Sequence, residues 1–434
     1  MITILGAGLS GLSVAYYYPK KSIIFEKLEK IGGTASTQND HGVLYDYGPH
    51  VSFTKDHYLI NLLLKYTSIF EKTANHMNAF KGNEFPHPAL FHLNKLPKDE
   101  RYKILIDYIE AYKNFYPLYK PINYDEWCVR SQGKYFAHNY TDLYTRKFWQ
   151  IDPKNLTTEW VGERLPIPSI HEALKGSFGL NEVYGYYFEK FRYPKNGGFE
   201  SFSNFWLDRK KDITINLKKE VISINTKNKT IRFKDGTYTH YNILVSTIPI
   251  PELPNIISNM PSKIKNMISK LRYTSLHYVN IAIKEKWKRN FTWLYFYDEE
   301  IPISRLIPYT KMSPYMAPKG YTPLQIEIPY SKRFQKDLVE VSLSKLQELG
   351  YIKSSNIARI SESDLKYGYV IYNKDREKYL EEILNYLKEL GIYSIGRYGS
   401  WAYLWSHQVI AQGKEFSDTI IKHLKLNLNG GDGN

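Results

Sequence analysis

The sequence predicts an α/β protein that begins with a Rossmann-like, dinucleotide-binding domain. Residues 2–5 form a short apolar run typical of a buried strand, and residues 6–11 have the glycine spacing G-x-G-x-x-G. A helical pattern follows in residues 12–16. A glycine turn between a strand and a helix places the helix N-terminus against a bound phosphate group.

Each glycine of this turn has a separate physical role. Gly6 permits the tight turn, Gly8 lets a pyrophosphate approach the backbone, and Gly11 lets the helix pack closely on the strand. Ser10 lies in the same turn and is expected to contact the cofactor. Sequence therefore assigns this stretch to phosphate binding.

An acidic residue at the end of the next strand supports the same interpretation. Residues 22–25 form a second apolar strand that ends at Glu26, about 20 residues after Gly6, where a carboxylate binds the ribose hydroxyls. Lys27 stands beside it.

A second glycine motif follows in residues 30–36. Its Gly33, Thr34 and Ala35 resemble the second motif of FAD-dependent oxidoreductases of the glutathione reductase and amine oxidase type. Glycines also mark ordinary turns, but strand, helix, acid and second motif agree here. We therefore expect FAD.

Composition limits the remaining options. The chain has 434 residues, of which 43% are hydrophobic and 24% charged, so we expect two or three folded domains. Cys128 is the only cysteine, which excludes an internal disulfide, and no secretory signal is evident, so a cytoplasmic location is expected.

The net charge of +15 comes from lysines scattered along the chain, and such a distribution does not indicate nucleic-acid binding. No integral membrane contact and no metal are expected.

The remaining chain predicts three domains. The FAD-binding domain comprises residues 1–65, 195–250 and 390–434, a mostly helical insertion comprises 66–194, and a substrate-facing β-sheet domain comprises 251–389. Helical spacing in residues 102–109 supports the insertion, and Pro194 with Gly197 and Gly198 ends it. The expected later elements are strands at 213–217, 221–224, 230–233, 278–283 and 324–328, a strand at 393–395, and a final helix at 410–424.

Motifs at both ends and in the middle resemble the UDP-galactopyranose mutase family, in its eukaryotic-type branch. This family lies within the superfamily of FAD-dependent amine oxidases and protoporphyrinogen-oxidase-like proteins. The motifs occur in the family's order, at residues 48–53, 144–149, 160–165, 192–198, 293–296 ahead of Arg305, and 396–403.

The resemblance implies an FAD-dependent nucleotide-sugar pyranose/furanose mutase. In that family, N5 of the reduced flavin attacks the anomeric carbon and expels the nucleoside diphosphate, and NAD(P)H serves as the reductant. The partner would be a small nucleotide sugar, and the oligomeric state stays open, with a homo-oligomer as one option.

The resemblance also implies site residues. Arg305 would clamp the diphosphate, Arg164 would orient the sugar, and His50 would steer the loop beside the flavin. Substrate would be bound by Tyr144, Trp149, Tyr295, Tyr309, Tyr369 and Tyr403. Further cofactor contacts would come from Gly48, Val221, Gly396, Arg397, His407, Gln408 and Val409.

Several positions depart from the family pattern. Leu90 and Phe188 stand where polar groups read the nucleotide and sugar, Met312 replaces a phosphate-binding tyrosine, and His407 replaces an asparagine. A sugar other than galactose, or another nucleotide, fits these changes.

Two other functions stay open. One is an FAD oxidase or desaturase that acts on an amine, a porphyrinogen or a polyene, and the other is a non-enzymatic FAD-stabilised scaffold. A structural ion pair is the alternative role for either arginine. An arginine clamp favours the mutase, because a hydrophobic substrate has no use for it.

Overall fold

A five-stranded parallel sheet forms the centre of the first domain in the computed structural model, which describes residues 1–114, 120–180 and 189–429. Its strand order is β19-β13-β1-β2-β9. The strands are β1 (Ile2–Leu5), β2 (Ser22–Phe25), β9 (Ile213–Asn216), β13 (Leu244–Ser246) and β19 (Ile392–Ser394). Segments from the start, middle and end of the chain therefore build one dinucleotide-binding sheet, and the predicted α/β fold class is confirmed.

The last helix packs against the first. Helix α13 (Ser406–Asn429) lies beside α1 (Leu9–Tyr17), where Ser13 Oγ donates to the Ile410 carbonyl at 2.7 Å. Gly413 permits this approach, because a Cβ there would lie 2.3 Å from Ser13 Oγ. The helix begins four residues earlier than the sequence pattern predicts, at Ser406.

A small antiparallel sheet accompanies this domain. Its strands are β10 (Val221–Asn225), β11 (Thr230–Phe233) and β12 (Tyr238–His240), and each pairs antiparallel with the next. The Phe233 ring lies 4.6 Å from the Phe25 ring at the end of β2, which fixes the small sheet against the large one.

The second large sheet has seven strands in the order β18-β14-β17-β16-β15-β6-β7. They are β18 (Ile357–Val370), β14 (Tyr273–Ile283), β17 (Thr322–Tyr330), β16 (Arg305–Pro308), β15 (Trp293–Phe296), β6 (His76–Phe80) and β7 (Asn83–Pro86). Helix α10 (Asp337–Glu348) covers one face through an apolar core that includes Leu346 and Ile326. The opposite face is left for the site.

Strands at both ends of residues 66–194 differ from the mainly helical prediction. Strands β6 and β7 belong to the seven-stranded sheet, and β5 (Ile69–Thr73) pairs with β8 (Lys190–Pro194). These four- and five-residue strands are fixed by pairing with distant segments, which a local helical periodicity does not reveal.

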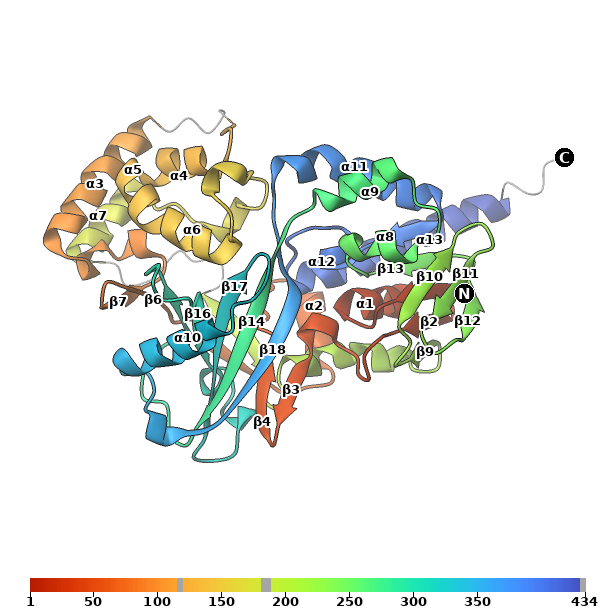
Figure 1. Ribbon diagram of the computed structural model, residues 1–434, viewed down its shortest axis with the longest axis horizontal. Helices are drawn as coiled ribbons and strands as arrows, with labels where there is room; N and C mark the ends of the chain where they lie inside the picture. Colours follow the sequence, from red (N-terminus) through yellow and green to blue (C-terminus); the bar gives the residue numbers. More distant parts are fainter. Residues whose placement is uncertain (115–119, 181–188, 430–434) are drawn as a thin grey trace.

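The interior of that segment is helical, as expected, and forms a lobe above the sheet (Figure 1). Its helices are α3 (Lys98–Lys113), α4 (Tyr124–Gln132), α5 (Lys134–Phe136), α6 (Asp142–Trp149) and α7 (Ile170–Phe178). A π-helical turn, Ala137–Thr141, joins α5 to α6. Lys147 fixes the lobe to the sheet, because its buried Nζ donates to the carbonyls of Phe296 and Asp298 at 2.8 and 2.5 Å.

The remaining helices and strands lie between these layers. They are α2 (His57–Leu64), α8 (Leu253–Ile256), α9 (Ser262–Ser269), α11 (Lys374–Glu389), α12 (Gly396–Gly399), β3 (Thr37–Asp40) and β4 (Val43–Asp46). Among the described residues, every helix is too short or too polar to traverse a lipid bilayer.

Candidate active site

One cavity of about 930 Å³ connects the glycine turn of the first domain with the space between the lobe and the seven-stranded sheet. The predicted catalytic and substrate residues in its wall are His50, Arg164, Arg305, Tyr144, Trp149, Tyr295, Tyr369 and Tyr403. The predicted cofactor residues in its wall are Gly6, Gly8, Ser10, Glu26, Lys27, Gly33, Thr34, Ala35, Gly48, Val221, Arg397 and Val409. Five predicted residues do not line it, namely Gly11, Tyr309, Gly396, His407 and Gln408.

The cofactor end is formed mainly by backbone. Gly8 is the N-cap of α1, and Gly8, Leu9 and Ser10 at the start of that helix line the cavity, where the helix leaves its first N–H groups without helical partners. A Cβ on Gly8 would have its nearest neighbour 3.7 Å away, whereas one on Gly11 would lie 2.0 Å from the Gly6 carbonyl oxygen. Gly11 is therefore required for packing, and Gly8 leaves room for a ligand.

Glu26 closes the same end. Its carboxylate accepts hydrogen bonds from the N–H groups of Ala7 at 2.7 Å and Leu28 at 2.9 Å, while the side chain stays in the cavity wall. These two amides hold the carboxylate beside the glycine turn. Helix terminus, carboxylate and glycine spacing together fit a dinucleotide such as FAD.

A row of side chains crosses the sheet face that forms the cavity wall. Across five strands the register aligns Asn78, Tyr295, Arg305, Glu327 and Tyr278 in neighbouring pairs. Directly opposed residues in paired strands point to the same face. We call these five residues the polar row. It runs from β6, the strand next to the edge strand β7, to β14, and its members Tyr295, Arg305 and Tyr278 line the cavity.

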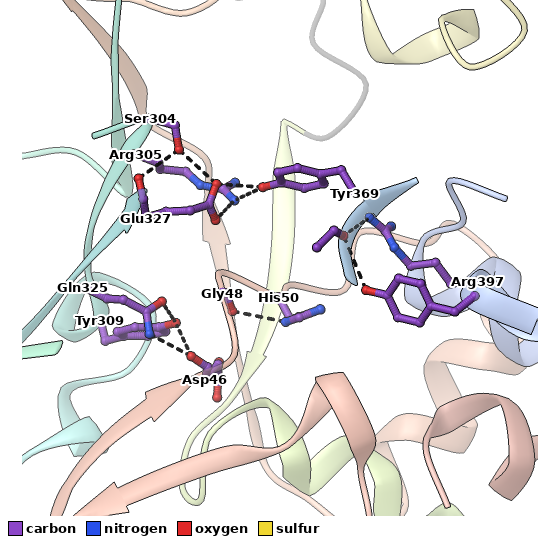
Figure 2. A network of polar contacts seen from close by, with 12 residues as sticks. Asp46, Gly48, His50, Ser304, Arg305, Tyr309, Gln325, Glu327, Tyr369 and Arg397 are labelled. Carbon is purple, nitrogen blue, oxygen red and sulfur yellow. Dashed lines mark hydrogen bonds and ion pairs between the residues drawn. The ribbon is translucent and has the colours of Figure 1, made fainter. Parts of the chain in front are cut away.

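Arg305 sits at the centre of the polar row in an ion pair (Figure 2). Its Nη2 donates to Glu327 Oε2 at 2.7 Å and to the Tyr369 hydroxyl at 3.1 Å. Tyr369 in turn donates to Glu327 Oε1 at 2.7 Å, and Ser304 Oγ donates to the same oxygen at 3.1 Å. Glu327 is 0% exposed, so Arg305 compensates a carboxylate that has no access to water.

Two more guanidinium groups line the cavity. Arg397 donates to the carbonyls of Leu404 at 2.9 Å and Gly368 at 3.1 Å, and among the described residues it makes no salt bridge. Arg164 donates to the carbonyls of Trp160 and Tyr403, and its guanidinium stacks 4.1 Å from the Trp405 ring. Backbone carbonyls orient both groups but leave the Arg397 charge uncompensated by protein carboxylates.

His50 lies between Arg305 and Arg397 in Figure 2. Its Nδ1 is 3.1 Å from the Gly48 carbonyl oxygen. Burial, with the positive charge of Arg397 and then Arg305, lowers the pKa of His50 to about 4. His50 is therefore neutral at physiological pH, and its Nδ1 is the protonated nitrogen if it donates to Gly48.

The sequence and the fold of this chain are similar to those of known proteins. A family model described as an NAD(P)-binding Rossmann-like domain matches residues 4–66. The crystal structure of reduced UDP-galactopyranose mutase superposes with a TM-score of 0.89 at 23% identity, over 97% of this chain and 93% of that one. The chain has the UDP-galactopyranose mutase fold.

Two further relatives extend the comparison. The dTDP-fucopyranose mutase of Escherichia coli is 24% identical over 211 residues, which is 47% of this chain and 53% of that protein, so the match spans about half its length. A protoporphyrinogen oxidase candidate from Exiguobacterium shares the fold at a TM-score of 0.74 and 16% identity, over 96% and 98% of the two chains. The fold thus also occurs in a protein with an oxidase name.

Tyr309 lies in a buried network beneath the cavity. Its hydroxyl donates to Gln325 Oε1 at 2.9 Å, Gln325 Nε2 donates to the Asp46 carbonyl at 2.9 Å, and Tyr309 itself is 0% exposed (Figure 2). Met312 is equally buried. Neither residue reaches the cavity, so the structure gives both a packing position.

The other predicted site residues lie at different distances from the cavity. Leu90 lines the cavity, whereas Phe188 lies outside the described residues. Gly396 instead packs on the phosphate turn, because a Cβ there would lie 2.1 Å from Ser10 Oγ. The His407 ring lies 5.2 Å from the Phe53 ring beside the cavity wall.

Sequence reasoning missed Glu327, Asn78, Tyr278 and His87. Glu327 had a usable signal, since it interrupts an apolar strand and a buried glutamate requires a partner. Asn78 and Tyr278 take their places from the pairing of β6 with β15 and of β14 with β17, and no local pattern encodes such pairing.

Proposed function

We propose that this chain is an FAD-dependent nucleotide-sugar pyranose/furanose mutase. The observation that carries this proposal is a single cavity that joins a dinucleotide cradle to three guanidinium groups, those of Arg164, Arg305 and Arg397. Cationic donors arranged in one cavity suit a diphosphate, because each fork can bind two oxygens. The two mutase relatives support the same reaction class.

The bound reduced flavin would supply the nucleophile, and the chain would supply positioning and charge. Arg305 and Tyr369, fixed by Glu327, would hold the diphosphate. Because Glu327 offsets the Arg305 charge, Arg397 and Arg164 would supply the net positive potential that stabilises the leaving group.

Aromatic groups would orient the rest of the substrate. Trp149 is 3% exposed and its ring lies 5.2 Å from that of Tyr403, so the two form one wall beside Arg164. Tyr144 and Tyr295 lie edge to face at 5.5 Å toward the lobe. Such walls exclude water and fix the ring that must open and reclose.

The Exiguobacterium relative favours a second candidate, an FAD oxidase. This candidate keeps the fold but gives no use to the three guanidinium groups. A hydrophobic or cationic substrate would leave the Arg397 guanidinium, which makes no salt bridge among the described residues, without an anion, and an uncompensated charge is costly in a buried site.

The deciding experiment uses purified holoenzyme reduced with dithionite or NAD(P)H. A panel that includes UDP-galactopyranose and dTDP-fucopyranose should yield a furanose isomer with reduced enzyme and none with oxidised enzyme, as measured by chromatography of the nucleotide sugars. Steady oxygen consumption on an amine or porphyrinogen, with no ring isomer from any sugar nucleotide, would instead establish the oxidase.

A further inference from the structure

The turn that carries His50 begins at Asp46, the last residue of β4, which is 0% exposed. The main-chain carbonyl of Asp46 accepts hydrogen bonds from the Gly48 N–H at 2.9 Å and from Gln325 Nε2 at 2.9 Å (Figure 2). Gly48 lines the cavity, and its own carbonyl oxygen lies 3.1 Å from His50 Nδ1. The main chain of Asp46 thus fixes the start of the turn, and the turn supports one side of the imidazole.

The carboxylate of Asp46 fixes a second support for the same ring. Its Oδ1 accepts hydrogen bonds from Thr37 Oγ1 at 2.6 Å and from the Phe199 N–H at 3.1 Å, and its Oδ2 accepts from the Tyr193 hydroxyl at 2.6 Å. The Phe199 ring lies 5.3 Å from the His50 ring, at an angle of 32°. The carboxylate therefore holds the residue on which His50 packs.

The surroundings of this carboxylate show a close fit and an unusual charge. A Cβ on Gly198 would lie 2.8 Å from Asp46 Oδ1, so a glycine is needed for the chain to bring the next amide, that of Phe199, to the carboxylate. The three donors carry no formal charge, and burial raises the pKa of Asp46 to about 6, so the group is mainly ionised at pH 7. A buried carboxylate held by neutral donors is costly, which indicates a role beyond packing.

We propose that Asp46 is the positioning residue for His50. This inference rests on the proposed mutase function, in which His50 lies beside the flavin. Asp46 holds the imidazole from two sides, through Gly48 by its main-chain carbonyl and through Phe199 by its carboxylate. The ring is thereby kept in one orientation in the cavity wall, although neither Asp46 nor Phe199 lines the cavity.

The test is a double-mutant cycle on kcat of the reduced holoenzyme. Asp46→Ala should lower kcat about tenfold, because it releases Phe199 and lets the imidazole leave its aligned position. In a His50→Ala background the same substitution should change kcat by less than about twofold, since no imidazole is left to position. The affinity of oxidised holoenzyme for UDP or dTDP, measured by isothermal titration calorimetry, should stay within about twofold of wild type, because the proposed diphosphate site is at Arg305.

Asp46→Asn is the conservative variant. Its amide oxygen can still accept from Thr37 and Phe199 while its amide nitrogen donates to the Tyr193 hydroxyl, so kcat should recover to within about threefold of wild type. If Asp46→Ala does not fold, the smaller loss in Asp46→Asn is measured in the same two backgrounds and should likewise vanish in His50→Ala.

A second readout does not depend on turnover. NMR titration of the histidines in oxidised holoenzyme, with the His50 signal identified by its loss in His50→Ala, should give His50 of wild type a pKa of about 4. Asp46→Ala should raise that pKa toward about 6.5, because a released ring gains access to water. The control is Tyr108→Phe, which removes a buried hydrogen bond to the Pro168 carbonyl in the lobe and should change neither kcat nor the His50 titration.

An equal loss of kcat from Asp46→Ala with and without His50, or an unshifted His50 titration in Asp46→Ala, would overturn the positioning role and leave Asp46 as a structural residue. Failure of reduced wild type to isomerise any nucleotide sugar would instead overturn the proposed function. In that case the NMR titration would still decide whether Asp46 holds His50 in place.

Discussion

The two ends of the cavity are built in different ways. At the cofactor end, four residues of one short stretch, Gly6, Gly8, Leu9 and Ser10, line the wall, and Glu26 is held by nearby amides. At the substrate end, the polar row takes one side chain from each of five strands. The cofactor end has no room for a side chain at Gly11, whereas the substrate end depends on the Arg305–Glu327 ion pair.

This contrast predicts different failures. Substitutions at the cofactor end should cause steric clashes that reduce folding or flavin content. Substitutions at the substrate end should unbalance a charge, so a second substitution of the partner residue should restore thermal stability but not nucleotide binding. The following experiments test that difference, beginning with the largest expected effect.

Two glycine substitutions separate packing from cofactor binding. Gly11→Ala places a Cβ 2.0 Å from the Gly6 carbonyl oxygen and should cost about 3 kcal/mol of stability or abolish folding. Gly8→Ala adds the same atom 3.7 Å from its nearest neighbour, so the apoprotein should keep its thermal midpoint while FAD affinity falls about tenfold. Full flavin occupancy in Gly8→Ala would contradict the cradle assignment.

Arg305→Ala should lose both stability and nucleotide affinity. It leaves Glu327 buried without a counter-charge, which costs about 3–5 kcal/mol, and removes the diphosphate fork. Adding Glu327→Gln should recover much of the thermal midpoint but not UDP or dTDP binding. A double variant that regains both would show that Arg305 serves packing only.

Acidification should destabilise the fold. Burial lowers the pKa of His50 and of His92 to about 4, whereas an unfolded histidine titrates near 6.5. Between these values the unfolded chain binds protons that the native state does not, so each histidine should cost about 2 kcal/mol from pH 7 to pH 5.

Asp46 acts in the opposite direction, because burial raises its pKa to about 6 and the native state gains a proton first. From pH 7 to pH 5, protonation of Asp46 should add about 1 kcal/mol to the free energy of unfolding, which is less than the two histidines together remove. Thermal midpoints should therefore fall on acidification, and His92→Gln should reduce that slope. The exposed His41→Gln is the control and should not change it.

Arg164→Ala should reduce turnover more than binding. Its guanidinium stacks on Trp405 at 4.1 Å beside the proposed sugar wall, so its loss should misplace the sugar and lower kcat about tenfold. The affinity for free nucleoside diphosphate should change by less than about threefold. An equal loss in both quantities would assign Arg164 to uniform binding instead.

Tyr309→Phe should have the smallest effect on function. Its hydroxyl bonds to Gln325 in the buried network and does not reach the cavity, so loss of the bond should cost about 1 kcal/mol in stability. Turnover and nucleotide affinity should stay within about twofold of wild type. A tenfold loss of nucleotide affinity would restore the substrate-binding role predicted for this residue.

The same contrast explains what sequence could predict. The glycine turn, the strands on either side of it and Glu26 lie within about 30 consecutive residues, so the spacing of the motif was enough to locate them. The family motifs also located Arg305, although not the Glu327 that holds it. The ion pair joins the adjacent strands β16 and β17, and Tyr295 pairs with Asn78 across strands far apart in the sequence, so both depend on a register that tertiary pairing sets.

The place of β6 at the boundary of the sheet has a consequence for how such enzymes diversify. Residues 76–90 supply Asn78, His87 and Leu90 from two outer strands and a following turn, while Arg305 and Glu327 come from strands further inside. Exchange of this short segment would alter the cavity wall at His87 and Leu90 without replacing Arg305 or Glu327. This part of the cavity wall can therefore be varied by replacing fifteen consecutive residues, 76–90, while the strands that carry the ion pair stay unchanged.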